Sequence, residues 1–170
     1  PACVNYALIV RVVEAIFVRG NDSWTKHCFE SVKDDKDGAI LIFVTGLAEI
    51  TATVEKLRSS EVLEGRATIH ALHSQLSTQD QQAIFRRAPK GTRKIVVSTN
   101  IAETSITIDD VVYVVDAARV KENRYDADRG LATLEEVFVS RAAARQRRAQ
   151  AVAVGRALRT ARHATAAGKR

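Results

Sequence analysis

The chain has few cysteines and few long apolar runs, and each shortage excludes a class of protein. Its only cysteines, Cys3 and Cys28, are spaced unlike any metal-binding motif, so a disulfide framework or a zinc site is not expected. No apolar run reaches the roughly 18 residues needed to span a bilayer, and no signal-peptide pattern opens the chain. We therefore expect a soluble intracellular protein, cytoplasmic or nuclear, with no membrane partner.

Acidic residues are missing from the end of the chain. Residues 141–170 hold nine Lys/Arg and no Asp/Glu, which leaves residues 1–140 with 17 basic and 20 acidic side chains. The formal net charge of +6 therefore comes from the tail, and with it any unspecific affinity for nucleic acid. Because the tail is mainly Ala and Arg with few large apolar groups, we expect a solvated helix or disorder there.

The rest of the chain alternates between short apolar runs and amphipathic segments. Ala39 to Val44 is continuously apolar between glycines, as in a strand buried on both faces. Strands and helices that alternate in this way predict an α/β fold, a mostly parallel sheet with helices on both faces. We expect strands at residues 39–44, 68–72, 94–97 and 111–115, and helices at residues 4–18, 47–57 and 77–87.

A length of 170 residues supports one domain. We expect three parts: a leading helix (1–20), the α/β domain (21–140) and a basic tail (141–170). Residues 121–130 are charged and turn-forming, and residues 131–139 are expected to be either the second strand of a hairpin or a short extended segment. Because the chain begins with Pro1 rather than Met, we expect it to be a piece of a longer protein.

One polar stretch lies between two buried strands. Ser98 to Asp110 is rich in hydroxyl groups and separates Ile95 to Val97 from Val111 to Val115. If these strands are parallel neighbours, the polar stretch leaves the sheet at the carboxyl end of the first, where open α/β sheets bind ligands. It is the first candidate for a functional site.

Several segments together resemble a known family. In order and spacing they are similar to the second RecA-like lobe of DEAH-box RNA helicases of the RHA type, and the string STNIAETSITID is the most specific of them. The resemblance covers about residues 4–148. The matching segments are Gly38 to Gly46, Leu72 to Ser74, Ser98 to Ile108, Val114 to Asp116 and Ser140 to Arg148.

The resemblance implies an RNA-binding surface. A translocating protein must hold RNA by phosphates and sugars, because base-specific contacts would stop it from sliding, and small hydroxyl and amide groups suit that task. The alternative is that these groups only cap a short helix. The residues implied to bind RNA are His73, Ser74, Ser98, Thr99, Asn100, Thr104 and Ser105, with Lys121 and Arg124 on the projecting hairpin.

The resemblance also implies nucleotide contacts. Phe85 matches an aromatic residue that stacks on adenine, although a Phe near a helix end is more often a core residue. Thr107 lies in the loop that couples RNA to nucleotide, and Asp109 matches a position near the nucleotide sugar. ATP and Mg²⁺ would be bound by the full-length enzyme together with a first RecA-like lobe, and neither is expected to bind tightly to this chain alone.

The sequence departs from the family in its last motif. Gln146 and Arg147 are present, but both following positions that the family fills with arginine fingers hold other residues. No phosphate-binding loop and no Asp-Glu-Ala-His sequence occurs in the chain. A glycine of the family is replaced by Ala118, which is tolerated if that position does not need a positive φ.

Three interpretations follow from these observations. The leading one is a fragment of an ATP-dependent RNA helicase that is not an independent ATPase. The second is a non-catalytic RNA-binding or partner-binding module with a basic tail, and the third is a generic α/β domain. The altered end of the chain predicts either a degenerate paralogue or a shifted reading frame after about Arg148, and the DNA in all three frames distinguishes the two.

Overall fold

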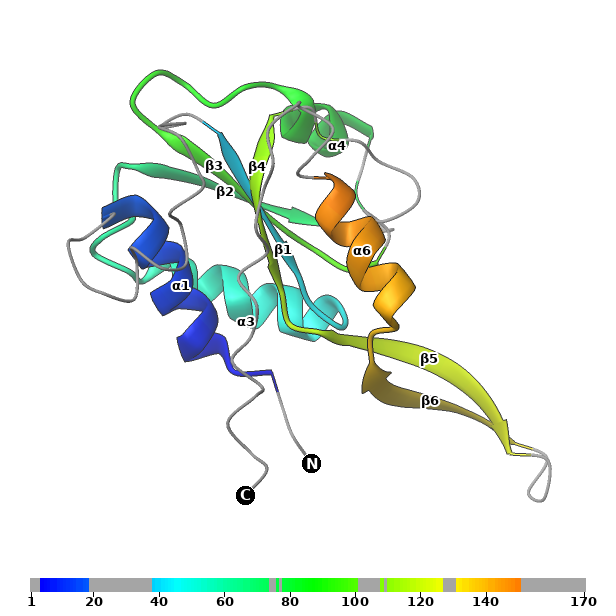
Figure 1. Cartoon of the computed structure of the whole chain (residues 1–170). Helices are drawn as coiled ribbons and strands as arrows, with labels where there is room; N and C mark the ends of the chain where they lie inside the picture. The colour runs from blue at the N-terminus through cyan, green and yellow to red at the C-terminus, as the bar shows by residue number, and fades with distance from the viewer. Residues whose placement is uncertain are drawn as a thin grey trace.

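The structure is a computed structural model of the whole chain, and it describes residues 4–18, 38–73, 76, 78–100, 108, 110–126 and 131–150 (Figure 1). Strands and helices alternate through most of it. In chain order the elements are α1 (Tyr6–Val18), β1 (Ala39–Phe43), α3 (Leu47–Arg58), β2 (Ala67–Leu72), α4 (Thr78–Phe85), β3 (Arg93–Ser98), β4 (Val111–Asp116), β5 (Arg119–Asp126), β6 (Leu131–Phe138) and α6 (Arg141–Gln150).

Four of the strands form one parallel sheet in the order β2-β3-β1-β4. Its central strands β1 and β3 are completely buried. This explains why β1 is continuously apolar and why β3 carries the unbroken apolar run Ile95 to Val97 rather than an alternating pattern. All the strands and helices expected in residues 4–115 are present. Each begins and ends within two residues of its predicted bounds. The predicted α/β class is therefore confirmed.

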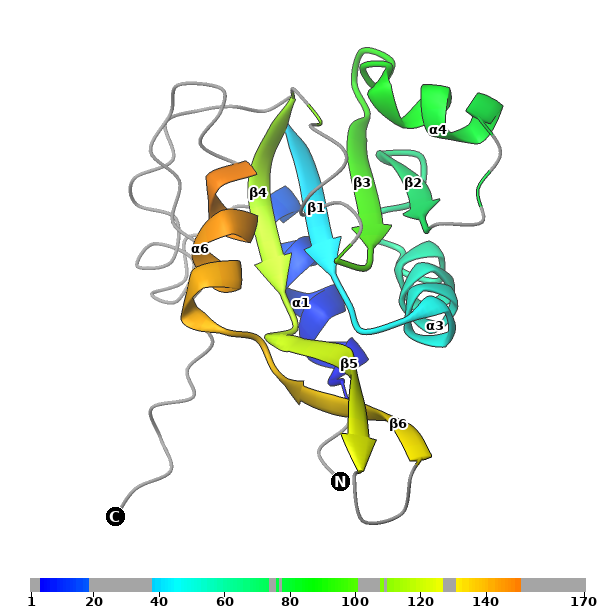
Figure 2. The ribbon, with the colours of Figure 1, turned by 90° about the vertical axis from the view of Figure 1, so that its right-hand side faces the viewer.

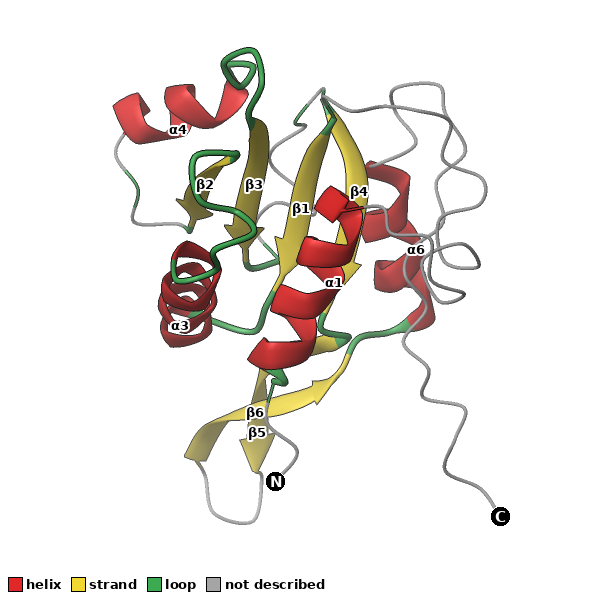
Figure 3. Ribbon diagram, turned by 90° about the vertical axis from the view of Figure 1, so that its left-hand side faces the viewer, coloured by secondary structure: helices red, strands yellow, loops and turns green. Residues whose placement is uncertain are grey.

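Helices cover both faces of the sheet (Figures 1 and 3). On one face, α1 and α3 pack against side chains such as Ile40 and Ile42 of β1. On the other face, Leu41 and Phe43 of the same strand pack with Ile84 of α4. The alternation of side chains along one strand thus feeds two separate apolar clusters, and their burial supplies most of the driving force for folding.

The strands β5 and β6 form the predicted hairpin, which is antiparallel and projects from the lobe (Figure 2). It pairs from Arg119↔Phe138 at its base to Asp126↔Leu131 near its tip. Leu134 and Phe138 remain 63% and 71% exposed. The hairpin therefore has no core of its own, and its direction depends on contacts at its base.

The edge strand β2 carries a histidine whose protonation is linked to stability. Burial lowers the pKa of His70 below its usual 6.5, and the positive charges of Lys94 and Arg58 lower it further. The folded state thus binds this proton less tightly than the unfolded state, so the contribution of His70 to stability is present above about pH 6.5 and is lost as the pH falls below that value. We expect urea unfolding midpoints to fall between about pH 7.5 and 5.5, and to fall less in His70→Gln. An equal fall in both proteins would contradict this assignment.

Candidate functional site

The carboxyl ends of the four parallel strands meet at one edge of the sheet. Ser98, the last residue of β3, is in register with Phe43 of β1 and with Leu72 of β2, and Phe43 is in register with Asp116 of β4. The residues that follow these strand ends therefore share this edge (Figure 2). It is the edge at which open α/β sheets bind ligands.

The expected RNA-binding residues at this edge differ in exposure. Ser98 is 0% exposed, and its hydroxyl donates to the carbonyl oxygen of Thr99 at 3.0 Å. Thr99 is half-buried and Asn100 is exposed, while His73 follows β2 and is also half-buried. Thr99, Asn100 and His73 are thus the described residues here that a ligand can reach, and Ser98 orients the backbone beneath them.

Several predicted site residues cannot be placed. Their roles in RNA or nucleotide binding remain predictions from the sequence. The residues that lie outside the described part of the chain are Ser74, Thr104, Ser105, Thr107 and Asp109.

The opposite, amino-terminal end of the sheet carries the predicted aromatic. Phe85 ends α4 and is 51% exposed, so the alternative that it is a core residue is wrong. The carbonyl oxygens on either side of it, those of Ile84 and Arg86, accept hydrogen bonds from Lys94 Nζ at 2.7 and 3.0 Å. Lys94 is buried and also pairs with Asp110 at 2.8 Å. The ring is therefore presented to the outside on an anchored backbone.

The remnant of the last motif is folded into the lobe. Arg147 is 1% exposed, and its Nη1 donates to Asp116 Oδ1 at 2.9 Å while its guanidinium lies 4.8 Å from the centre of the Phe43 ring. Gln146, one residue earlier, is exposed. The sequence predicts a solvated helix or disorder here, and α6 is a helix with mostly exposed side chains, held to the lobe by one buried charged side chain rather than by apolar ones.

Ala118 occupies a backbone conformation that suits glycine. Its φ is +60°, and it is the one described residue other than glycine with a positive φ. The condition under which alanine is tolerated here is therefore not met. We expect Ala118→Gly to raise the free energy of unfolding by about 0.5–1 kcal/mol, because removal of the Cβ strain outweighs the added freedom of the unfolded chain. Chemical denaturation measures this, and Ala117→Gly, one residue earlier and without a positive φ, should instead lower stability.

The base of the hairpin is held by a second ion pair. Lys121 Nζ lies 2.9 Å from Glu49 Oε1 at the start of α3. Burial by itself raises the pKa of Glu49, but the hydrogen bond from Lys121, a backbone hydrogen bond and the positive charge of Lys121 bring the pKa below its usual value. Gly46 leaves room for the pair, because a Cβ there would lie 2.8 Å from Glu49 Oε2. Lys121 therefore faces the lobe in this structure; the side chain of Arg124, the other hairpin residue expected to bind RNA, is not described.

Sequence reasoning missed the buried ion pairs Lys94–Asp110 and Arg147–Asp116. The first pair had a visible signal, since a lysine directly precedes an apolar run and an aspartate directly precedes the next one. The second pair joins residues 31 positions apart. Only the fold shows that they meet.

The described residues thus form a single parallel α/β lobe with polar side chains at the carboxyl edge of its sheet and an exposed aromatic residue at the opposite end. The family model described as helicase conserved C-terminal domain matches residues 23–161. The chain belongs to this family, and its relatives identify it as the C-terminal RecA-like lobe of a DEAH-box helicase.

Two curated relatives illustrate the similarity. The chain is 54% identical over 118 residues to the human protein described as putative ATP-dependent RNA helicase DHX57, across 67% of this chain and 8% of that protein. It is 48% identical over 153 residues to the Arabidopsis thaliana DExH-box ATP-dependent RNA helicase DExH2, across 89% of this chain and 9% of that protein. The chain thus spans less than a tenth of the length of either relative.

Solved structures show the same fold. The crystal structure of the Escherichia coli DEAH/RHA helicase HrpB is 32% identical, with a TM-score of 0.70, and the match covers 91% of this chain and 18% of that one. A second structure, of the E. coli DExH-box NTPase HrpB, matches at 33% identity and a TM-score of 0.68. The fold prediction of a RecA-like lobe is therefore confirmed.

Among the residues that the structure describes, no helix is long and apolar enough to cross a membrane. Within the same residues, no three His, Cys, Asp or Glu side chains are grouped closely enough to hold a metal ion.

Proposed function

We propose that this chain is the second lobe of an ATP-dependent RNA helicase and that it holds single-stranded RNA at the carboxyl edge of its sheet. The alignment of the strand ends at this edge is the observation that carries the proposal. It brings His73, Thr99 and Asn100 together as small polar groups next to a rigid sheet. Such groups can donate hydrogen bonds to phosphates and sugars without reading bases.

The opposite end of the sheet is proposed to meet the nucleotide. The half-exposed ring of Phe85 fits an adenine base, since stacking needs only a free aromatic face. Asp109 and Thr107 stay proposed nucleotide contacts. Mg²⁺ and the phosphates would be held by a first lobe, because this sequence has no phosphate-binding loop. ATP hydrolysis, an RNA substrate and an intracellular location are proposals for the longer protein.

Binding of a labelled single-stranded oligouridine to the chain tests the RNA surface. We expect Thr99→Ala/Asn100→Ala to raise the Kd about tenfold to thirtyfold, since two hydrogen bonds to phosphate are worth about 1.4–2 kcal/mol together. The salt dependence of the Kd should stay unchanged, because no cation is lost.

The matched control removes a hydroxyl and an amide elsewhere. Thr51 and Gln82 are exposed on α3 and α4, and Thr51→Ala/Gln82→Ala should bind RNA as tightly as the wild-type chain. If both double variants bind like the wild type, the carboxyl edge is not the RNA surface.

A non-catalytic RNA-binding module is the second candidate, and it is favoured because the two positions that the family fills with arginine fingers hold other residues here. In this case the basic tail should supply much of the affinity. Deleting residues 151–170, which hold five Lys/Arg and no acidic residue, would then reduce the slope of log Kd against log salt by as much as about 3.5. An unchanged slope would reject a role for the tail.

A further inference from the structure

The hairpin and α6 are connected twice, once through the chain and once through a buried ion pair. The chain runs from Asp116 through β5 and β6 directly into α6, whose first turn is capped by Ser140 Oγ accepting from the Ala143 N–H at 3.1 Å. The ion pair between Arg147 and Asp116 then links α6 back to the end of β4, where the hairpin begins. The hairpin is therefore attached to the lobe at both of its ends, through β4 and through α6.

Arg147 is the anchor of α6 in this attachment. Among the α6 side chains whose burial the structure describes, residues 141–149, it is the one that is fully buried. Its charge is neutralised by Asp116, and its guanidinium carbon lies 4.8 Å from the centre of the Phe43 ring. Arg147 therefore attaches α6 to the sheet through a buried charged contact.

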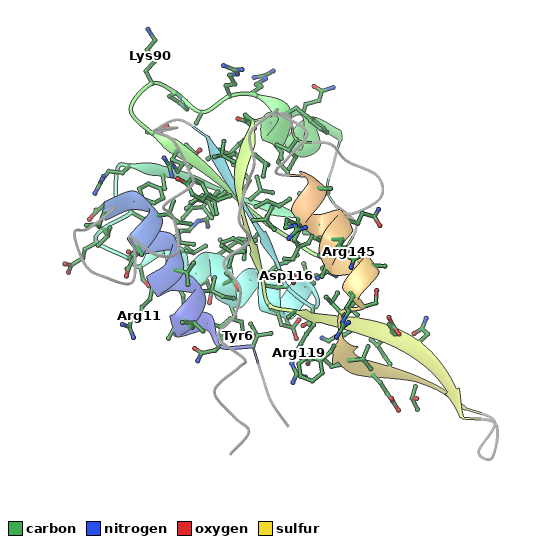
Figure 4. The ribbon with its side chains drawn as sticks, viewed as in Figure 1. Tyr6, Arg11, Lys90, Asp116, Arg119 and Arg145 are labelled. Carbon is green, nitrogen blue, oxygen red and sulfur yellow. The ribbon has the colours of Figure 1, made fainter. Side chains whose placement is uncertain are left out.

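The carboxylate that holds Arg147 also holds the turn into the hairpin. Asp116 Oδ1 accepts from the Ala118 N–H at 2.8 Å as well as from Arg147. Ala118 has a φ of +60°, and its carbonyl oxygen accepts from the Val139 N–H at 3.0 Å where the two hairpin strands leave the lobe. Figure 4 shows Asp116 at this point, with Arg119 at the base of the hairpin.

We propose that Arg147 and Asp116 are positioning residues that set the direction of the β5–β6 hairpin from the position of α6. A shift of α6 moves Arg147, moves or releases the shared carboxylate, and so changes the turn at Ala118. The helix α6 runs from the hairpin back toward the end of the sheet where α4 lies (Figures 1 and 2). Ligand binding at that end that shifts α6 would therefore change the direction of the hairpin. This last consequence rests on the proposed function, whereas the positioning itself does not.

Pulsed electron resonance between two spin labels tests the positioning in the full chain. One label is placed at Lys56→Cys, exposed on α3, and the other at Leu134→Cys, exposed on β6, with Cys3 and Cys28 replaced by serine. Arg147→Met should at least double the width of the distance distribution. Arg147→Lys should restore part of the original width, because lysine keeps the charge that pairs with the carboxylate but not the planar guanidinium that lies over Phe43.

The matched control is Arg148→Met, which makes the same chemical change at the exposed neighbouring position and should leave the distribution as it is. If Arg147→Met is folded by circular dichroism and keeps the wild-type distribution, the proposal is overturned. If Arg147→Met does not fold, Asp116→Asn decides: a broadened distribution supports the proposal, and a wild-type one overturns it. RNA binding at Thr99 and Asn100 is measured separately, so its failure would not be confused with either result.

Discussion

Lys94→Met should lower the free energy of unfolding by about 3–5 kcal/mol, because it breaks a buried ion pair and leaves two carbonyl oxygens without their donor. Lys94 is 1% exposed, and its Nζ contacts Asp110 at 2.8 Å, Ile84 O at 2.7 Å and Arg86 O at 3.0 Å. Methionine keeps the length of the apolar stem, so the loss is polar rather than steric. Urea denaturation followed by circular dichroism measures it.

Lys90→Met is the matched control, because Lys90 is exposed and points away from the lobe (Figure 4). We expect it to change stability by less than about 0.5 kcal/mol. Asp110→Asn added to Lys94→Met should recover part of the loss, since the unpaired carboxylate is then removed. A Lys94→Met variant within about 1 kcal/mol of the wild type would show that the pair does not hold α4 and Phe85 in place.

Gly38→Ala is the second substitution for which we expect a large loss, of about 3 kcal/mol or more, or failure to fold. A Cβ at this position would lie 1.9 Å from Val112 Cγ2 and 2.4 Å from Val112 Cβ. Gly38 directly precedes β1, and the position of a Cβ is fixed by the backbone, so β1 and β4 would have to separate at their amino ends, where Ala39 is in register with Val111. The requirement is for close approach, not for an unusual φ.

Gly65→Ala is the comparison that distinguishes the two reasons for a glycine, which are a close neighbouring side chain and a positive φ. Gly65 has a φ of +64°, and a Cβ there would meet nothing within 4 Å. We expect this variant to lose only about 1 kcal/mol from backbone strain. If thermal or chemical unfolding shows Gly38→Ala to be no less stable than Gly65→Ala, the close contact with Val112 is wrong.

The fold could be predicted because its signals are local. Six apolar residues between Gly38 and Gly46 can only be a short buried strand, and the helical period of residues 47–57 follows at once. The position of the candidate site followed from the same reasoning, because parallel strands place their carboxyl ends together. The polar segment after β3 was therefore found without the structure.

The missed features depend on contacts between distant parts of the chain. Nothing near Arg147 in the sequence indicates that it is buried, and its partner Asp116 belongs to a strand 31 positions earlier. The backbone strain at Ala118 could not be predicted either, because φ at a turn is set by the strands that it connects. Ser98 looked like a contact residue by type, whereas the register of β3 with β1 and β2 places it inside.

Photo-crosslinking of a 4-thiouridine oligonucleotide to the chain, with the crosslinked peptides identified by mass spectrometry, tests the central claim most directly. If the lobe holds RNA at the carboxyl edge, crosslinks should fall in the segments that follow β2 and β3, residues 73–76 and 99–107, and should weaken in Thr99→Ala/Asn100→Ala. Crosslinks confined to residues 151–170, or to α1 and α3, would contradict it.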